Sequence, residues 1–435
     1  MSKKKSKISL PPIRFVPSAE TEEEQIAILE SITPSPGFPT FANMIADVIT
    51  KRSETTVFDF TPQVVNIRYQ IDNVWHAMPS MDRETGDFMM ATLKHLAGMN
   101  FRERRQRQSG TFKATFLDTG HKCRVVSQGV KHGERVALYV DITKPDTNTL
   151  EELGMPEKVK DMLTPSLGES TGMILFAAMP GAGYTSLWRA GLSACDRFMR
   201  DYYVIENEKD AEQEVVNVTP VFFDAAAGED AFTPIPKLLL REPNVVAFAD
   251  ITNGKMLDQM SDLSSDGFLV LSRLYAKHSL DALLRLLVLK PAEIERLATE
   301  LRAIVSMRLL RKICDVCRIS YVPHPSMLQK LGLPPSSVRQ MFKAFEFKPG
   351  MVDENENEIE MCPNCNGLGY KNITGIFEVL NITDGLRETL IKKPRMDHLL
   401  AAAKASQHVS IRDMGVVAVA QGVTSMEEVQ RMLKK

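Results

Sequence analysis

The sequence lacks any apolar run close to the roughly 20 residues that cross a bilayer. Its opening segment, MSKKKSKISLPPIRF, carries lysines without the apolar stretch of a signal peptide. These two absences predict a cytoplasmic protein without a transmembrane segment. The lysine cluster could contact anionic lipid, but one weak signal rarely anchors a chain, so we favour a solvated tail.

The chain also lacks an excess of positive charge, with 53 Lys and Arg against 55 Asp and Glu and a formal net charge of -2. It therefore has no global basic field of the kind that attracts nucleic acid, and we expect no nucleic-acid partner. Its 435 residues exceed what one hydrophobic core usually supports, and 44% of them are hydrophobic. We therefore expect two or more domains.

Cysteine is scarce, with six residues in the chain, but four of them form two C-x-x-C pairs. In a chain without an export signal this pairing favours metal over disulfides. Four thiolates close a tetrahedral site and leave no position for water, so we predict structural zinc rather than catalysis, with unpaired core thiols as the alternative. The other two cysteines, Cys123 and Cys195, are expected to be small buried hydrophobes. The predicted ligands are Cys314, Cys317, Cys362 and Cys365.

The pattern of apolar runs predicts a tail and two domains. Short strand-like and helical stretches alternate in the first domain, whereas the second has apolar runs such as MILFAAM, YYVIE, VVAFAD and GFLVLSRL between helical stretches. That second pattern is typical of a parallel sheet covered by helices. The expected divisions are a flexible tail with at most one short helix (1–40), an N-terminal α+β domain (41–144), and an α/β domain (145–435) that contains the zinc subdomain (about 312–370) and a helical C-terminus (380–435).

A glycine-rich segment follows the first of these apolar runs. A phosphate-binding loop has the form G-x-x-x-x-G-K-[ST] between a strand and a helix. The window here begins at Ala178 and reads AMPGAGYT, so Gly181, Gly183 and Thr185 fit the pattern, whereas the lysine position holds Tyr184. The window alone leaves an ordinary strand-to-helix turn as the simpler interpretation.

Landmarks along most of the chain resemble the type II secretion and type IV pilus assembly ATPase family, of the GspE/PilB type. In the first domain NIRYQIDNVWH and MNFRERRQRQSG are similar to the family's "R-Y-R-I-D-G" and "ERR-x-x-Q-x-G" segments, and CRVVSQ and HGERVAL follow. In the second, MRLLRKIC, CPNCNGLGYKNITGIFEVL and SIRDMGVVAVAQGVTSMEEV are similar to the family's pattern. The resemblance implies a RecA-like P-loop NTPase core after the N-terminal domain, with an inserted tetracysteine zinc subdomain and C-terminal helices.

The resemblance also implies the equivalents of the family's ATP-binding segments, and these are altered. Its acidic box "I-E-D-P" corresponds to Ile205–Glu208, which keeps Glu206 but replaces the aspartate with Asn207. Its Walker B glutamate corresponds to Asp250, and its two histidines correspond to Phe268 and Tyr275. The implied catalytic residues are Asp250 and Glu206, and the implied nucleotide-binding residues are Gly181, Gly183, Tyr184, Thr185 and Ser186, with Arg124 and Arg135 from the first domain approaching nucleotide at subunit interfaces.

These substitutions predict impaired ATP hydrolysis. Phosphoryl transfer depends on positioning and on neutralising phosphate charge, and a tyrosine supplies no cation. Loss of one preorganised donor to developing charge typically costs about 10²–10³ in rate. Three alternatives remain open: a relocated cation from Arg189, Arg273 or Lys277, Mg-ATP bound through loop amides and Thr185 without turnover, and an empty pocket kept for packing.

The resemblance implies a hexamer that works on an inner-membrane platform protein. With altered ATP-binding segments, we expect a structural or regulatory pseudo-ATPase subunit, in a homo- or hetero-hexamer with an active paralogue or on the platform in its place. The rival is an active ATPase with unconventional residues. Nucleic-acid binding by the zinc module is disfavoured, since 318–361 has few aromatic-basic clusters and ends in an acidic run. From the resemblance we also expect the N-terminal part to be too short for the extra domain with which many members of the family dock on membrane-bound partners.

Overall fold

The computed structural model describes residues 11–131, 133–142, 149–334, 338–353, 355–406 and 408–434. The chain divides between Pro145 and Asp146 into two compact units. The predicted boundary near Pro145 falls within residues 143–148, which lie outside the described residues. Among the described helices, none has the length and apolar character needed to cross a membrane.

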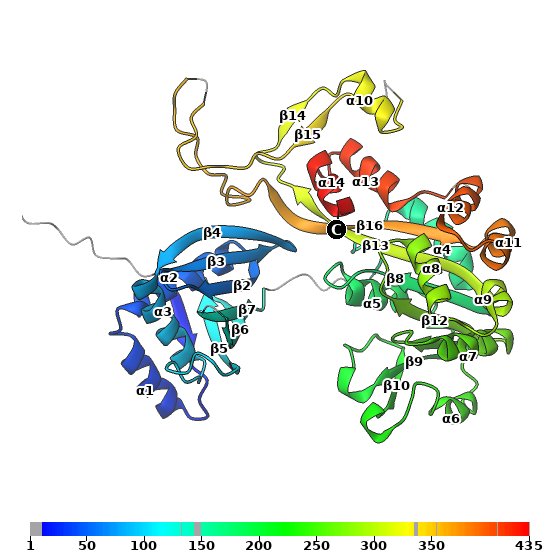
Figure 1. Ribbon diagram of the computed structural model, residues 1–435, viewed down its shortest axis with the longest axis horizontal. Coiled ribbons are helices and arrows are strands. Elements are labelled where there is room, and N and C mark those ends of the chain that lie inside the picture. Colours follow the sequence, from blue (N-terminus) through cyan, green and yellow to red (C-terminus); the bar gives the residue numbers. More distant parts are fainter. Residues whose placement is uncertain are drawn as a thin grey trace, which may run out of the picture. The chain divides into compact units, whose positions relative to one another are not determined.

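The first unit contains a seven-stranded antiparallel sheet in the order β1-β5-β6-β7-β2-β3-β4 (Figure 1). Its edge strand β1 pairs with β5 and buries Phe15 against the rings of Phe41 and Phe112. The strands are β1 Ile13–Val16, β2 Ser53–Phe60, β3 Val64–Ile71, β4 Val74–Asp82, β5 Gln108–Phe116, β6 Thr119–Val130 and β7 Gly133–Val140.

The structure differs here from the predicted flexible tail by strand β1, whereas the one short helix allowed in that segment is present as α1. Strand β1 lies within segment 1–40, and helix α1 follows it with a capping box in which the hydroxyl of Thr21 accepts from the amide of Glu24. An aromatic residue in a four-residue strand gives too little periodicity for sequence analysis to separate it from a loop. Residues 1–10 lie outside the described residues. The helices of this unit are α1 Glu22–Ile32, α2 Gly37–Thr50 and α3 Arg83–Leu96.

The second unit has a seven-stranded sheet in the order β10-β9-β11-β12-β8-β13-β16. Strand β8 is buried at every position, with Ile174 and Phe176 in one hydrophobic cluster and Met173 and Leu175 in another. Alternate side chains of a strand face opposite sides of the sheet, so helices cover both faces, as expected for an α/β fold. Its strands are β8 Gly172–Ala177, β9 Tyr202–Asn207, β10 Thr219–Phe223, β11 Val245–Phe248, β12 Leu269–Leu274, β13 Leu301–Ile313 and β16 Tyr370–Asn381.

The predicted parallel sheet is correct except at one edge, where β16 pairs antiparallel with β13. Helices α4, α5, α13 and α14 contribute residues to one hydrophobic cluster, and α7, α8, α9, α11 and α12 contribute to the other. The helices are α4 Glu157–Gly168, α5 Tyr184–Ala194, α6 Ile235–Leu239, α7 Gly254–Ser265, α8 Ser279–Val288, α9 Ile294–Glu300, α11 Asp384–Lys392, α12 Met396–Ala405, α13 Ile411–Ala420 and α14 Met426–Lys434, with 3-10 turns at Glu208–Asp210 and Ala225–Ala227.

The tetracysteine segment lies between β13 and β16. It contains the antiparallel pair β14 Ile319–Tyr321 and β15 Met341–Lys343 and the short helix α10 Pro325–Lys330. The segment TSMEEV suggests that the side chain of Thr424 caps the N-terminus of the last helix, α14. The structure shows a different residue in that role. The hydroxyl of Ser425 accepts from the amide of Glu428, whereas the Thr424 hydroxyl donates to the carbonyl of Arg311.

Candidate functional site

A glycine turn joins β8 to α5. Gly181 and Gly183 have φ values of 73° and 86°, in the left-handed region that favours glycine. A Cβ atom at Gly183 would lie 2.3 Å from the Cε atom of Met307 on β13. That atom is the end of a flexible side chain that can move aside, so the positive φ, rather than lack of space, favours glycine at this position.

Helix α5 begins at Tyr184, directly after the loop. The amides of Tyr184, Thr185 and Ser186 lie in its first turn, where helical geometry provides no intrahelical acceptor. Such a turn after a glycine loop is suited to an anion. The strand, loop and helix predicted around the window AMPGAGYT are therefore present.

The side chain of Tyr184 is 8% exposed and turns toward the end of β11. Its hydroxyl donates to Oδ1 of Asp250 at 2.5 Å, and its ring stacks on Tyr275 with 4.2 Å between ring centroids. Burial and the Asp250 carboxylate raise the pKa of Tyr184, so the phenol stays protonated and neutral. The two positions that resemble the family's Walker lysine and glutamate thus contact each other.

A buried arginine from β12 completes this group. The guanidinium carbon of Arg273 lies 4.6 Å from the centroid of the Tyr184 ring. Its Nη2 is 3.4 Å from Oδ2 of Asp250, and its Nη1 is 2.6 Å from Oε1 of Glu212. Burial alone would lower the pKa of Arg273, but the two carboxylates outweigh it and raise that pKa. We call Tyr184, Asp250, Arg273, Glu212 and Tyr275 the tyrosine–arginine cluster.

Glu206 lies at the end of β9, beside this cluster. Its side chain is buried, and its Oε2 accepts from the amide of Glu212 at 3.2 Å. Burial raises the pKa of Glu206. Asn207, in the place of the family's aspartate, donates to Oδ2 of Asp210 at 2.7 Å and accepts from the amide of Ala225 at 3.5 Å.

Of the three cations considered as substitutes for the lysine, the structure brings Arg273 to Asp250. Arg189 instead lines a cavity of about 150 Å³ together with Glu206 and Glu212. Lys277 is exposed, and its backbone amide donates to Asp281.

The four predicted metal ligands form a second site. The sulfur atoms of Cys314, Cys317, Cys362 and Cys365 all lie within 4.8 Å of one another. The Cys314–Cys362 and Cys317–Cys365 sulfur separations are 3.9 Å and 3.6 Å. A tetrahedron with metal–sulfur bonds of about 2.3 Å has edges of about 3.8 Å, so these thiols fit a zinc ion.

Groups around the sulfurs hold this geometry in place. The amide of Gly369 lies 3.3 Å from the sulfur of Cys365, and Nδ2 of Asn364 lies 3.4 Å from that of Cys314. Gly369 has a φ of 72°, and a Cβ atom there would lie 2.9 Å from the carbonyl oxygen of Phe345. Donors of this kind orient the ligands of a metal and offset thiolate charge.

A family model described as Type II/IV secretion system protein matches residues 34–431. The chain belongs to this family. Among the relatives of this Type II/IV secretion system protein is the type II secretion system protein E of Dickeya dadantii, 26% identical over 97% of this chain and 81% of the relative. The type IV pilus assembly ATPase PilB of Pseudomonas aeruginosa is 25% identical over 90% of this chain and 66% of its own length.

Solved structures support the fold. The ATPase DotB of Legionella pneumophila superposes with a TM-score of 0.53 at 10% identity, over 96% of this chain and 97% of DotB. The DotB of Yersinia pseudotuberculosis gives 0.52 at 12% identity, over 96% of this chain and 95% of that one. The family's two-part α/β architecture is therefore present in this chain.

The two arginines carried over from the family lie in the first unit, on neighbouring strands. The guanidinium of Arg124 on β6 lies over the Tyr139 ring, 4.4 Å from its centroid. Arg135 on β7 pairs with Asp59 at 2.5 Å, which raises the pKa of Arg135. Both therefore have partners within their own sheet.

Sequence reasoning missed Glu212 as a member of the site. It lies in the loop after β9, in an acidic stretch where nothing distinguishes it from Glu208 or Glu214. Its contact with Arg273 depends on the path of that loop and leaves no local signal. Tyr275 was identified by the resemblance, but its stacking on Tyr184 is a feature of the fold.

Proposed function

We propose that this Type II/IV secretion system protein is a catalytically impaired, cytoplasmic subunit of a type II secretion or type IV pilus machine. It acts as a structural or regulatory pseudo-ATPase within a hexamer that contains an active paralogue, or on the inner-membrane platform protein in place of that paralogue. Membership of the family supports the assignment to a secretion or pilus machine. The tyrosine–arginine cluster supports the proposal that ATP hydrolysis is impaired.

The observation that carries this proposal is the pairing of Tyr184 with Asp250. A Walker lysine would offer a positive charge to the β- and γ-phosphates, whereas the phenol is neutral and already donates to the carboxylate. Asp250 is one methylene shorter than the family's glutamate, and a misplacement of about 1 Å costs about 10²-fold in rate. Positioning of an attacking water would therefore be poor.

Arg273 does not restore the missing charge in this arrangement. It faces Asp250 and Glu212 together, so an incoming polyphosphate would have to compete with two carboxylates for one guanidinium. The side chain of Asp250 is about half exposed, but Arg273 and Glu212 form a largely buried pair, and separating such a pair is costly. We infer that Mg-ATP, where it binds, is held by the loop amides and the Thr185 hydroxyl without turnover.

We also propose that Cys314, Cys317, Cys362 and Cys365 hold a structural zinc ion. Sulfur separations near those of a tetrahedral site and the supporting donors favour zinc over loose thiols. The ion would stabilise the fold of the segment between β13 and β16 and take no part in phosphate chemistry.

Steady-state phosphate release with Mg-ATP tests the proposed impairment. We expect release by the wild-type protein to equal that of Thr185→Ala and Asp250→Ala proteins purified in the same way. Release that disappears in both variants would instead support the second candidate, an active ATPase in which Arg273 replaces the lysine. The proximity of Arg273 to Asp250 is the observation that favours this candidate.

A further inference from the structure

A basic cleft of about 550 Å³ lies in the first unit, and no residue of the tyrosine–arginine cluster lines it. Three parts of the chain line it: the N-terminal end of α3, the loop 102–107, and the described residues 129–131 and 133–134 at the adjoining ends of β6 and β7. Four cations contribute, and the full lining is Arg83, Arg104, Arg105, Gly129, Val130, Lys131, Gly133 and Glu134.

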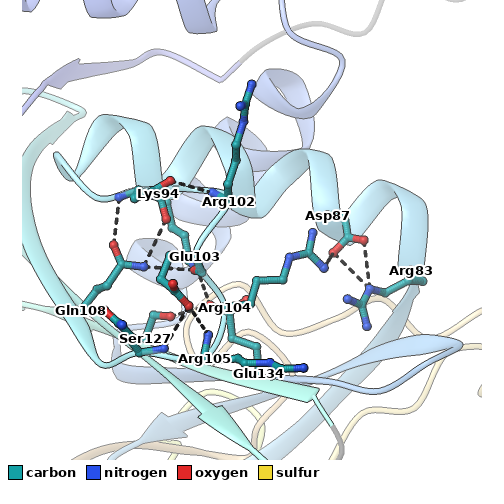
Figure 2. Close-up of polar contacts among 12 residues, drawn as sticks. Arg83, Asp87, Lys94, Arg102, Glu103, Arg104, Arg105, Gln108, Ser127 and Glu134 are labelled. Atoms are coloured by element: carbon teal, nitrogen blue, oxygen red, sulfur yellow. Dashed lines mark hydrogen bonds and ion pairs between the residues drawn. The ribbon is translucent and has the colours of Figure 1, made fainter.

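The loop that supplies two of these arginines is stabilised by hydrogen bonds among its own residues and the adjacent Gln108. The Glu103 carboxylate accepts from the amides of Arg105 and Gln106 at 2.6 and 3.0 Å, and these bonds lower the pKa of Glu103. Gln108 also donates to the carbonyl of Glu103. The Glu103 carboxylate is therefore hydrogen-bonded to the backbone of its own loop, and Figure 2 shows this carboxylate turned toward the loop amides.

A buried ion pair lies beneath the loop. Lys94 is 1% exposed and donates to the carbonyl of Glu103 at 2.7 Å and to the carboxylate of Glu134. Ser127 donates to the same carboxylate. The negative charge of Glu134 in the cleft is thus already matched by a buried cation, so it opposes an incoming anion only weakly.

Two of the cleft's arginines, Arg83 and Arg104, form ion pairs with the same carboxylate, that of Asp87. Nε of Arg83 and Nη1 of Arg104 lie 3.0 and 3.1 Å from Asp87. Figure 2 shows Arg104 reaching from the loop toward Asp87, whereas Arg102 points away from this group. Arg105 and Lys131 are exposed. Of the four cations that line the cleft, two are thus paired with Asp87 and two are exposed, and the Glu134 of the lining is paired with Lys94.

Glycine at position 129 lets the loop 102–107 approach β6, and glycine at position 133 lets β7 pass close to the end of β2. A Cβ atom at Gly129 would lie 2.7 Å from the backbone of Arg105, and one at Gly133 would lie 1.9 Å from the carbonyl of Phe60. The amide of Gly129 donates to the carbonyl of Arg105 at 3.1 Å. The cleft is thus a built feature of the fold rather than a chance gathering of long side chains.

We propose that this cleft binds a phosphoryl anion, either a free phosphorylated ligand or a phospholipid headgroup. Arginine guanidinium groups match phosphate oxygens in pairs of hydrogen bonds, and an exposed lysine adds a point charge. The proposal is independent of ATP turnover, because every residue that carries it lies outside the tyrosine–arginine cluster.

The test compares two charge-reversal variants of the full chain with the wild type. Arg105→Glu with Lys131→Glu changes the cleft, and Arg102→Glu with Arg107→Glu makes the same change in net charge on exposed residues that do not line it. Calorimetry measures the binding of inorganic pyrophosphate, the probe for a free phosphorylated ligand. Co-sedimentation with vesicles of phosphatidylcholine, with and without phosphatidylglycerol, measures the headgroup.

We expect binding of at least one probe to weaken about tenfold or more in the cleft variant and to be retained in the matched variant. If the cleft variant loses binding to pyrophosphate alone, the ligand is a free phosphorylated molecule. If it loses binding to phosphatidylglycerol vesicles alone, the ligand is a lipid headgroup. Arg105→Gln with Lys131→Gln repeats the test should the reversal variant fail to fold. Failure of the wild type to bind either probe, or equal binding by both variants, would overturn the proposal.

Discussion

At the scale of single residues, Tyr184 changes both the charge and the shape of the loop. A lysine there would be a flexible cation, whereas the tyrosine ring is packed between neighbours and its hydroxyl is bonded to Asp250. A ligand that needs the Tyr184 hydroxyl or the Asp250 carboxylate must displace this hydrogen bond. The same contacts therefore predict both stability and poor catalysis.

Tyr184→Phe removes the hydroxyl but keeps the ring. Because a hydrogen bond to a carboxylate is lost, we expect the free energy of unfolding to fall by about 1–3 kcal/mol. Urea denaturation measures the change. Tyr275→Phe is the matched control, since Tyr275 stacks in the same pair but is about half exposed (48%). Equal effects of the two substitutions would contradict the assigned role of the Tyr184 hydroxyl.

A second residue-scale prediction concerns Glu378, which is 2% exposed. Burial raises its pKa, but hydrogen bonds from His408, Ser279 and the amide of Ile411 outweigh burial, and the pKa lies below its ordinary value. A lowered pKa stabilises the fold at pH values above the unfolded pKa of about 4.3 and loses that contribution as pH falls toward the folded value.

We therefore expect the free energy of unfolding to decrease with falling pH below about 5. The decrease should be steeper in the wild type than in Glu378→Gln, which has no carboxyl to titrate at this position. Denaturation at a series of pH values measures both slopes. Identical slopes would show that this carboxyl does not contribute.

At the scale of elements, β13 and β16 connect the sheet of the second unit to the tetracysteine segment. Cys314 directly follows β13, and Tyr370 begins β16. The position of the metal ligands therefore depends on this strand pair, and in return a bound ion would fasten the ends of the two strands.

Cys362→Ser should remove one ligand of the proposed zinc ion. We expect the purified wild-type protein to contain about one zinc ion per chain, and the variant to lose it and to be cleaved faster by protease within 314–370. Elemental analysis and limited proteolysis measure the two effects. Cys195→Ser serves as control, because Cys195 is buried elsewhere in the same unit. Zinc retained by the Cys362 variant would contradict the ligand assignment.

Helix α14 is tied to β13 by a buried charge. Glu428 is 1% exposed and contacts the guanidinium of Arg311 at 2.9 Å and that of Arg431. Glu428→Gln leaves Arg311 buried without its charge partner, so we expect a loss of about 3–5 kcal/mol in unfolding free energy.

Its exposed neighbour provides the control for that prediction. Glu427→Gln makes the same chemical change one position earlier on α14, and it should cost less than about 0.5 kcal/mol. Thermal denaturation of both variants measures the difference. A similar cost for the two would contradict the importance of the Arg311 pair.

The sequence allowed some elements to be predicted and not others. Strands β8, β9, β11 and β12 are short apolar runs, because both of their faces are buried, and these are easily recognised. Strand β13 carries Arg308 and Arg311, whose partners include residues of the distant helix α14. These two charged residues interrupt the apolar run by which a buried strand is recognised in a sequence. The tetracysteine cluster was predictable from spacing, whereas the Glu212–Arg273 contact depends on a loop path and was not.

At the scale of the whole molecule, the family's architecture is retained while its ATP-binding residues are changed. The match covers residues 34–431, and the strand, loop and helix around Gly181 and Gly183 are in place. Three of the altered positions, Tyr184, Asp250 and Tyr275, meet in one cluster. An intact fold around an altered site is what we expect of the proposed pseudo-ATPase subunit.

The most direct test of this account is phosphate release with Mg-ATP by the wild type beside Arg273→Gln, at matched concentration and ionic strength. The account predicts that both proteins release phosphate at the same background rate, because Arg273 is committed to Asp250 and Glu212. Clear release by the wild type that Arg273→Gln abolishes would contradict it, and would identify Arg273 as the cation that replaces the lysine.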